Sequence, residues 1–234
     1  MDVFAIALQD HFYKNLADTL WLHNSYGDPE EMPVDVFFRS EDEMSDMEIL
    51  ALSLCNGKIL DAGAGVGSHA LLLQGGQKDV SALEISGTAC SIMEERNVKN
   101  IIHDDFLRYC EKDYDTILML MNGIGLAGNL KQLPFLMRHC KKLLRKNGQI
   151  IFDSSDISYL YEGHSPPKDR YFGEVRYQYQ YKKLKGEWFE WLYIDQQTIS
   201  DIAAAENLNF EVLAEDDSDQ YLGRLTAKNT CVFL

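Results

Sequence analysis

Residues 58–74 read KILDAGAGVGSHALLLQ, and this stretch decides the fold class. Lys58 to Ala62 holds a short apolar run suited to a strand, and Ser68 to Gln74 suits a helix that Gly75-Gly76 would end. The turn between them contains Gly63, Gly65 and Gly67. A turn of this kind lets a ligand approach the backbone closely and meet the N–H groups of a helix N-terminus.

Composition limits the class of protein. The chain has 234 residues, 46% hydrophobic and 25% charged, which is enough for a substantial core. Its formal net charge of −15 disfavours nucleic acid and membrane surfaces as partners. The five cysteines show no CxxC spacing, so neither a disulfide framework nor a zinc site is indicated, and a cytoplasmic location is expected. The start, MDVFAIALQDHF, resembles neither a secretory signal nor a membrane span.

Strands and helices are predicted to alternate around the glycine turn. The expected strands after it are Val80–Glu84, Val98–Ile102, Tyr114–Met121 and Gln149–Asp153, and the expected helices are 43–54, 86–97 and 133–144. This alternation predicts an α/β fold with a doubly wound, Rossmann-like parallel sheet. Ligands bind at the carboxyl ends of such strands, which would place Asp61, Glu84, Asp104 or Asp105, Asn122 and Asp153 along one rim.

The two ends of the chain carry other patterns. Residues 2–24 repeat a large apolar side chain every four positions, which predicts a helix that packs on the core, or less favourably lies over the ligand site as a lid. Tyr171–Tyr193 alternates and predicts an aromatic β-hairpin turning at Lys185-Gly186. The hairpin could extend a packed sheet, form a homodimer contact or wall a substrate pocket. A helix from Thr198, a strand at Phe210–Ala214 and a last strand around Cys231–Leu234 would complete the chain.

Four motifs, in order, resemble those of the class I S-adenosylmethionine-dependent methyltransferases, from about Glu43 to the C-terminus. DAGAGVG at Asp61–Gly67 is similar to the first motif, and Glu84 to the acidic residue that holds the ribose. HDDF at His103–Phe106 resembles the adenine motif, and 115–122 and 143–153 resemble the fourth and fifth strands. The resemblance implies a seven-stranded, mostly parallel sheet whose last strand is antiparallel. It also implies the cofactor S-adenosylmethionine and the product S-adenosylhomocysteine.

The resemblance also implies which residues contact each part of the cofactor. Asp61 would meet the amino group, and Gly63, Ala64 and Gly65 the methionine and ribose portions. Glu84 with Ile85 would hold the ribose. Asp105 with Phe106 would meet adenine, with Asp104 as the competing choice, and Asn122 with Gly123 would touch the methionine end.

We expect one domain across residues 1–234. It would comprise an N-terminal helix and lid segment at 1–42, a cofactor-binding core at 43–156, the β-hairpin insertion at 157–194 and the C-terminal part of the core at 195–234.

The acceptor is expected to be a small molecule, because the lid-like helix and the insertion could enclose it. Candidate acceptor residues are Tyr13, Tyr26, Arg39, Asp153 and Tyr177, with His11 and His164 also considered. An aromatic pocket with carboxylates suits an amine or a small aromatic acceptor. No general base is identified, since His69 is expected to be a helix-surface or packing residue. No metal site is expected, because Asp153 and Asp156 lack a convincing third ligand.

Two alternatives remain open. A dinucleotide-dependent dehydrogenase would need GxGxxG, with its third glycine at the position of Ser68. A non-catalytic module that binds S-adenosylmethionine would carry the same cofactor motifs. The enclosing segments favour an enzyme over such a module.

Overall fold

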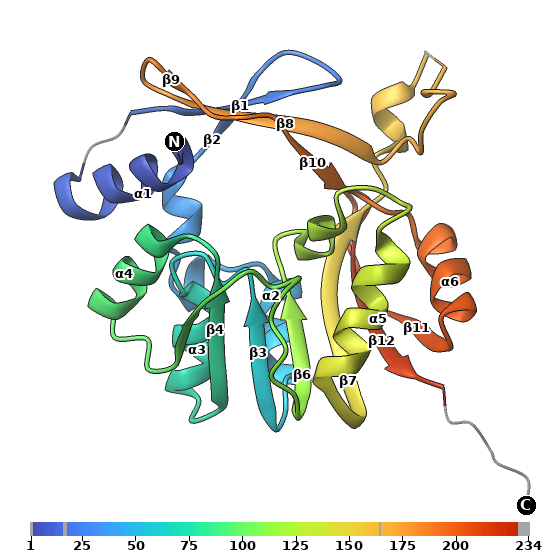
Figure 1. Ribbon diagram of the computed structural model, residues 1–234. Helices are drawn as coiled ribbons and strands as arrows, with labels where there is room; N and C mark the ends of the chain where they lie inside the picture. The colour runs from blue at the N-terminus through green and yellow to red at the C-terminus, as the bar shows by residue number, and fades with distance from the viewer. Residues whose placement is uncertain (1, 16–17, 164, 229–234) are drawn as a thin grey trace, which may run out of the picture.

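The computed structural model describes residues 2–15, 18–163 and 165–228, and its core is a seven-stranded sheet (Figure 1). In spatial order the strands are β11 (Leu208–Glu215), β12 (Gln220–Ala227), β7 (Leu144–Ser155), β6 (Tyr114–Met119), β3 (Lys58–Ala62), β4 (Asp79–Glu84) and β5 (Ile101–His103). Neighbouring strands from β7 through β6, β3 and β4 to β5 pair in parallel. Strand β12 runs antiparallel to both of its neighbours, β7 and β11. The predicted fold class is confirmed.

Helices cover both faces of this sheet. They are α2 (Asp46–Leu54), α3 (Ser68–Gly75), α4 (Gly87–Glu95), α5 (Leu133–Leu143) and α6 (Gln196–Ala205). Ile59 of β3 packs in the cluster with α2, α3 and α4, and its neighbour Leu60 packs in the cluster with α5 and α6. A strand buried on both faces is expected to be apolar at successive positions, as Ile59 and Leu60 are.

A second, antiparallel sheet lies over the carboxyl ends of β3, β4 and β6 (Figure 1). It consists of β1 (Leu20–Asn24), β2 (Glu30–Met32), β8 (Glu174–Tyr181), β9 (Leu184–Lys185) and β10 (Phe189–Leu192), and we call it the roof sheet. Its strand order is β10-β8-β1-β2, with β9 on β8. The roof sheet therefore joins the N-terminal segment to the insertion after β7.

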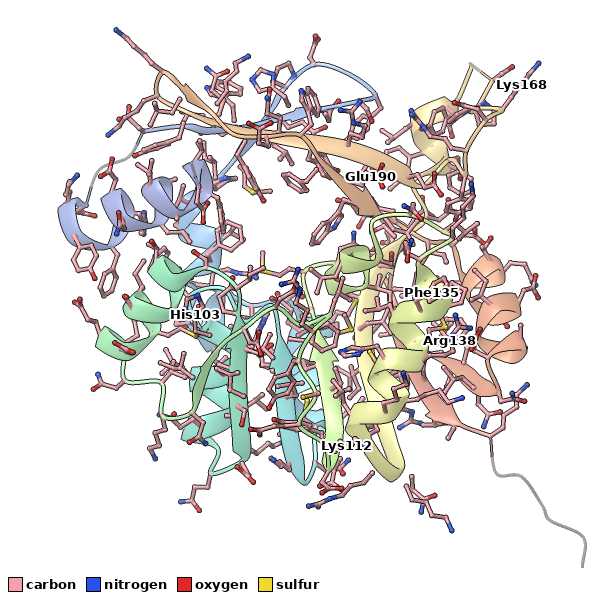
Figure 2. All side chains as sticks on the ribbon, in the orientation of Figure 1. His103, Lys112, Phe135, Arg138, Lys168 and Glu190 are labelled. Carbon is pink, nitrogen blue, oxygen red and sulfur yellow. The ribbon has the colours of Figure 1, made fainter. Side chains whose placement is uncertain are left out.

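The roof is attached to the core by polar contacts as well as by the chain. Glu190, labelled in Figure 2, lies on β10, where its carboxylate accepts a hydrogen bond from Asn129 Nδ2 at 2.9 Å. Asn129 follows the short 3-10 helix η3 (Gly123–Ala127), which continues from the end of β6. This contact holds one edge of the roof over the parallel strands.

The predicted helix over residues 2–24 is wrong in its second half. Helix α1 (Val3–Lys14) ends at Asn15, which is left-handed, and residues 20–24 form β1. Leu20 and Leu22 are buried and Trp21 between them is exposed, which is the period of a strand. Pairing of β1 with β8 supplies the partner that the local sequence could not reveal.

Other boundaries also differ from the predictions. Helix α2 begins at Asp46, after the 3-10 helices η1 (Val34–Phe37) and η2 (Glu41–Glu43). Helix α6 is capped by Asp195 instead of Thr198, because the Asp195 carboxylate accepts from the Thr198 N–H at 2.8 Å. The aromatic hairpin is confirmed, but its chain first reverses at Lys182, which is left-handed, before β9.

The antiparallel strand at the C-terminal end is β12, where no strand was predicted. The strand predicted around Cys231–Leu234 lies outside the described residues. Among the helices that the structure describes, none is long and apolar enough to cross a membrane.

Candidate functional site

The glycine turn after β3 is tied to the neighbouring strand. The N–H groups of Gly63 and Ala64 both donate to the Leu83 carbonyl of β4, at 2.9 and 3.0 Å. Gly65 and Gly67 have φ angles of 56° and 84°, a region that side chains strongly disfavour. A Cβ at Gly67 would lie 2.8 Å from Val98, whereas at Gly65 it would meet no heavy atom within 4 Å. Gly67 thus packs against the core, and Gly65 borders open space.

A cavity of about 370 Å³ lies between this turn and the roof sheet, and we call it the turn cavity. Of the residues that the sequence assigned to the cofactor, it is lined by Asp61, Gly63, Ala64, Gly65, Glu84, Ile85, Asp105, Phe106 and Gly123. The roof sheet contributes Tyr177, Tyr179, Phe189 and Trp191, the chain directly after β10 contributes Tyr193, and α1 contributes Phe4. Phe4 also stacks on Tyr179, with ring centroids 5.0 Å apart, so α1 both packs against the roof and walls the cavity.

Asp61 is the unusual carboxylate of this cavity. It is 2% exposed, and its Oδ2 has no hydrogen-bond partner within the described part of the chain. Burial raises the pKa of Asp61 to about 6, with His69 opposing the shift and Glu84 adding to it. Buried polar atoms are almost always paired, so this oxygen is suited to a ligand that donates a hydrogen bond or carries positive charge.

Glu84 lies at the end of β4 and supports the turn. Its Oε2 accepts from the Gly65 N–H at 2.9 Å, and its Oε1 accepts from the Ser86 N–H at 2.8 Å. Burial raises the pKa of Glu84, and these N–H donors oppose the shift. Each carboxylate oxygen can accept a further hydrogen bond, so Glu84 can receive two adjacent hydroxyl groups.

The two neighbouring aspartates after β5 differ in their surroundings. Asp105 lines the turn cavity, and its Oδ1 accepts from the Leu107 N–H at 2.9 Å. Asp104 is not among the residues that line either cavity, and its carboxylate accepts from the Asp105 N–H at 2.8 Å. Ile85 and Leu107 line the turn cavity although they are 65% and 54% exposed. They provide apolar surface for a flat ring next to Asp105.

A second cavity of about 620 Å³ adjoins the first, and we call it the side cavity. Both cavities are lined by Arg39, Met121, Tyr177 and Tyr193. Met121 and Asn122 follow β6 with consecutive φ angles of 57° and 55°. Two left-handed residues in succession, neither of them glycine, are the kind of backbone strain found at functional sites.

Asn122 borders the side cavity instead of the turn cavity. Its N–H donates to both carboxylate oxygens of Asp153, at 2.9 and 3.0 Å, and its Nδ2 donates to the Leu192 carbonyl at 3.2 Å. Gln220 of β12 also donates to Asp153, at 2.8 Å. Asn122 and Asp153 therefore connect the parallel sheet to β10 and β12.

The predicted acceptor residues are only partly brought together. Tyr26, Arg39, Asp153 and Tyr177 all line the side cavity. Tyr13 does not, because its half-exposed ring lies on the outside of α1 and its hydroxyl donates to Glu95 of α4 at 2.6 Å. His11 packs on Phe38, with ring centroids 4.6 Å apart, and His164 lies outside the described residues.

Sequence reasoning missed a charged cluster beneath both cavities. His69 lines the turn cavity, is only 9% exposed, and places Nε2 2.9 Å from Glu48 Oε1. Arg39 donates to the same carboxylate at 2.6 and 3.0 Å. Burial disfavours the charged form of Glu48, but His69, the Ser45 N–H and Arg39 outweigh it and lower its pKa to about 2.

A local signal for part of this cluster existed. Ser45 and Glu48 form a capping box at the start of α2, a spacing that is visible in the sequence. Arg39 and His69 approach the Glu48 carboxylate only in the folded chain, so no local sequence pattern could predict these contacts.

Comparisons with known proteins agree with this geometry. A family model described as a methyltransferase domain matches residues 36–215. The solved structure of a SAM-dependent methyltransferase from Bacteroides fragilis, in complex with S-adenosyl-L-homocysteine, is 40% identical. That match has a TM-score of 0.89 and covers 97% of this chain and 95% of that one.

Two more distant solved structures show the fold alone. The CcbJ methyltransferase from Streptomyces caelestis is 15% identical, with a TM-score of 0.64 and coverage of 83% of this chain and 95% of that chain. An S-adenosylmethionine-dependent methyltransferase from Clostridium acetobutylicum is 14% identical, with a TM-score of 0.59 and coverage of 96% and 98%. A comparison with curated proteins gave no match.

The chain belongs to the methyltransferase domain family. It is an S-adenosylmethionine-dependent methyltransferase, so the predicted enzyme class and cofactor are confirmed, in preference to a dehydrogenase.

Proposed function

We propose that the turn cavity holds S-adenosylmethionine and that the enzyme transfers its methyl group to a small molecule in the side cavity. The observation that carries this proposal is the unpartnered Oδ2 of Asp61, buried where the cofactor's amino group would need a partner. A cofactor with an ammonium and a sulfonium suits a cavity bordered by Asp61 and Glu84, where a pyrophosphate would be repelled.

The other contacts follow the lining of the turn cavity. Glu84 would receive the ribose hydroxyls, beside the backbone of Gly63, Ala64 and Gly65. Asp105 is favoured over Asp104 for the adenine amino group, since only Asp105 borders the cavity. Ile85 and Phe106 would flank the adenosine.

Two residues after β6 would serve the methionine end differently. Gly123 lines the turn cavity and could touch the cofactor directly. Asn122 would act by holding Asp153 and β10 in place, because its own amide nitrogens are engaged with them.

The sulfonium supplies an activated methyl group when the cofactor is bound, so the protein mainly needs to orient the acceptor and exclude water. Tyr177 and Tyr193 border both cavities, and they would close the space in which the two reactants meet. The roof sheet encloses this space, which favours a small acceptor over a macromolecule.

Binding of the demethylated cofactor tests the proposed site. Titration calorimetry should show that S-adenosylhomocysteine binds the wild type and that Glu84→Ala weakens the binding by about 1–3 kcal/mol, because charge-assisted hydrogen bonds are lost. Glu94→Ala is the matched control, since Glu94 is exposed on α4 and borders neither cavity. Equal affinities in Glu84→Ala and wild type, with both variants folded, would refute the site.

Three wider expectations stay proposals. We propose that residues 1–234 act as one domain, because the roof sheet draws strands from both the N-terminal segment and the insertion. A homodimer through the hairpin would have to use its outer face, near the exposed Trp188, since Tyr177 and Tyr179 of β8 border the turn cavity. The cytoplasmic location rests on the cysteine pattern alone.

A further inference from the structure

Three tyrosine hydroxyls form a chain across the roof of the side cavity. The Tyr177 hydroxyl lies 3.2 Å from the hydroxyl of Tyr26 and donates to that of Tyr193, also at 3.2 Å. The rings of Tyr26 and Tyr177 meet edge to face, with centroids 6.2 Å apart. Burial raises the pKa of all three phenols, so they stay neutral and offer aromatic faces and hydroxyl oxygens to a ligand.

The charged side chains around this cavity are mostly acidic. Glu30 of β2 lines it together with Tyr26, Tyr177 and Tyr193. The charge of Glu30 also raises the pKa of these three phenols. Asp153 borders the opposite side, at the end of β7. Aromatic faces together with carboxylates attract cations.

The cavity offers little to an anionic ligand. Among the described side chains that line it, Arg39 is the one cation. Each nitrogen of its guanidinium is already engaged, because Nε donates to the Val36 carbonyl at 2.8 Å and both Nη atoms donate to Glu48. Arg39 and Glu48 therefore cancel, and Glu30 with Asp153 leaves the cavity negative.

We propose that the side cavity binds an amine carried on an apolar or aromatic body, with the ammonium held by Glu30 and the three tyrosines. This inference rests on the proposed function and names the acceptor class for the same site. The apolar body would lie against Leu22 and Met32 of the roof sheet and against Leu120 and Leu160, which also line the cavity. A volume of about 620 Å³ is within the usual range for a small-molecule pocket.

The transfer step balances with no further reactant. The bound ammonium first releases one proton to water through the mouth of the cavity, where Glu30 is exposed. The freed nitrogen lone pair forms the new N–C bond as the C–S bond breaks, and the electron pair of that bond stays on sulfur. The products are the methylated ammonium, the thioether and the released proton.

Three probes of similar shape test the acceptor class. Phenethylamine, phenethyl alcohol and phenylacetate share an aromatic body and differ in their polar end. Calorimetry on the full chain, saturated with S-adenosylhomocysteine, should show the amine binding at least about tenfold tighter than the alcohol and the acid. Equal binding, preference for the acid, or no binding of any probe would overturn the proposal.

Neighbouring carboxylates on β2 provide a matched pair of variants. Glu30 and Glu31 are adjacent on one strand, so their side chains point to opposite faces, and only Glu30 borders the side cavity. Glu30→Gln should reduce the preference for the amine over the alcohol about fourfold, the size expected for a partly exposed ion pair. Glu31→Gln removes the same charge and should leave the preference unchanged. A preference that survives Glu30→Gln, or falls equally in both variants, would overturn the role of Glu30.

The two levels of the proposal fail differently. If S-adenosylhomocysteine itself does not bind, the proposed function fails. If it binds and the amine is not preferred, only the acceptor class fails.

Discussion

Asp61 joins the fold to the proposed chemistry. Its position at the end of β3 follows from the apolar strand before it and the glycine turn after it, both of which are visible in the sequence. Burial then makes its charge costly, as the raised pKa of about 6 shows. A bound ammonium would relieve that cost, so the affinity for the cofactor should depend on the ionisation of this one carboxyl.

Affinity for S-adenosylhomocysteine should therefore fall in acid. The pKa of Asp61 is about 6 in the empty cavity, so between pH 7 and pH 5 the carboxyl becomes mostly neutral and loses its attraction for the ammonium. We expect an approximately tenfold loss of affinity over this range, measured by titration calorimetry. Asp61→Asn should bind more weakly at pH 7 and lose most of the pH dependence. A wild-type affinity that is unchanged from pH 7 to pH 5 would contradict this role.

The stability of the empty protein should change with the opposite sign. An unfolded aspartate ionises near pH 4, before the folded one, so the folded state binds more protons between about pH 4 and about pH 6. The free energy of unfolding should accordingly fall as the pH rises through this window, with Asp61 and Asp153 both contributing. Asp61→Asn should reduce this slope in denaturant titrations at successive pH values, and a slope equal to that of the wild type would refute the assignment.

At the scale of elements, the strand, glycine turn and helix at 58–75 have two separable roles, which are packing in the core and lining of the turn cavity. Gly67 is the N-cap of α3 and packs against Met93 and Val98, whereas Gly65 faces the cavity and donates to Glu84. One glycine serves the fold and the other serves the ligand.

Substituting each glycine should separate these roles. Gly67→Ala places a methyl group against Val98 and Met93 in a left-handed backbone, so the free energy of unfolding should fall by about 2–4 kcal/mol. Gly65→Ala meets only open space and should cost about 1–2 kcal/mol through backbone strain. Its affinity for S-adenosylhomocysteine should drop at least about tenfold, because the methyl group would border the cofactor. Denaturant unfolding and calorimetry on both variants check this, and equal losses of stability would contradict it.

The parallel core was predictable because its signals are local. Strand β3, the Ser86 cap of α4 and the apolar run of β6 each follow from a few neighbouring residues. The strand β1 was not predictable in this way, since Leu20 continues the four-residue spacing of α1 and only pairing with β8 makes it a strand. The contact between Glu48 and His69, which are 21 residues apart, was hidden for the same reason.

At the scale of the whole molecule, the two sheets contribute different kinds of side chain to the turn cavity. The seven-stranded sheet presents Asp61, Glu84 and Asp105 at its carboxyl ends, as a doubly wound sheet should. The roof sheet faces them with aromatic side chains from β8 and β10. Most residues predicted for the cofactor line the turn cavity, because they lie at the ends of neighbouring parallel strands. Local patterns could not assemble the facing side, because the roof combines residues 20–32 with 174–192 through long-range pairing.

Ion pairs of Asp10 connect helix α1 to the roof sheet. Asp10 of α1 accepts hydrogen bonds from Lys14 and, at 2.5 Å, from Lys182 next to β8. These cations lower the pKa of Asp10 to about 2, so the ion pairs persist at any pH used for the binding experiments. The N-terminal helix is thereby attached to the roof sheet.

A crystal structure of the full chain with S-adenosylhomocysteine tests the central claim most directly. We predict that the ligand fills the turn cavity between the two sheets, with its ammonium nitrogen about 2.7–3.2 Å from Asp61 Oδ2 and its ribose hydroxyls on Glu84. A ligand bound outside the turn cavity, or one whose ammonium lies away from Asp61, would contradict it.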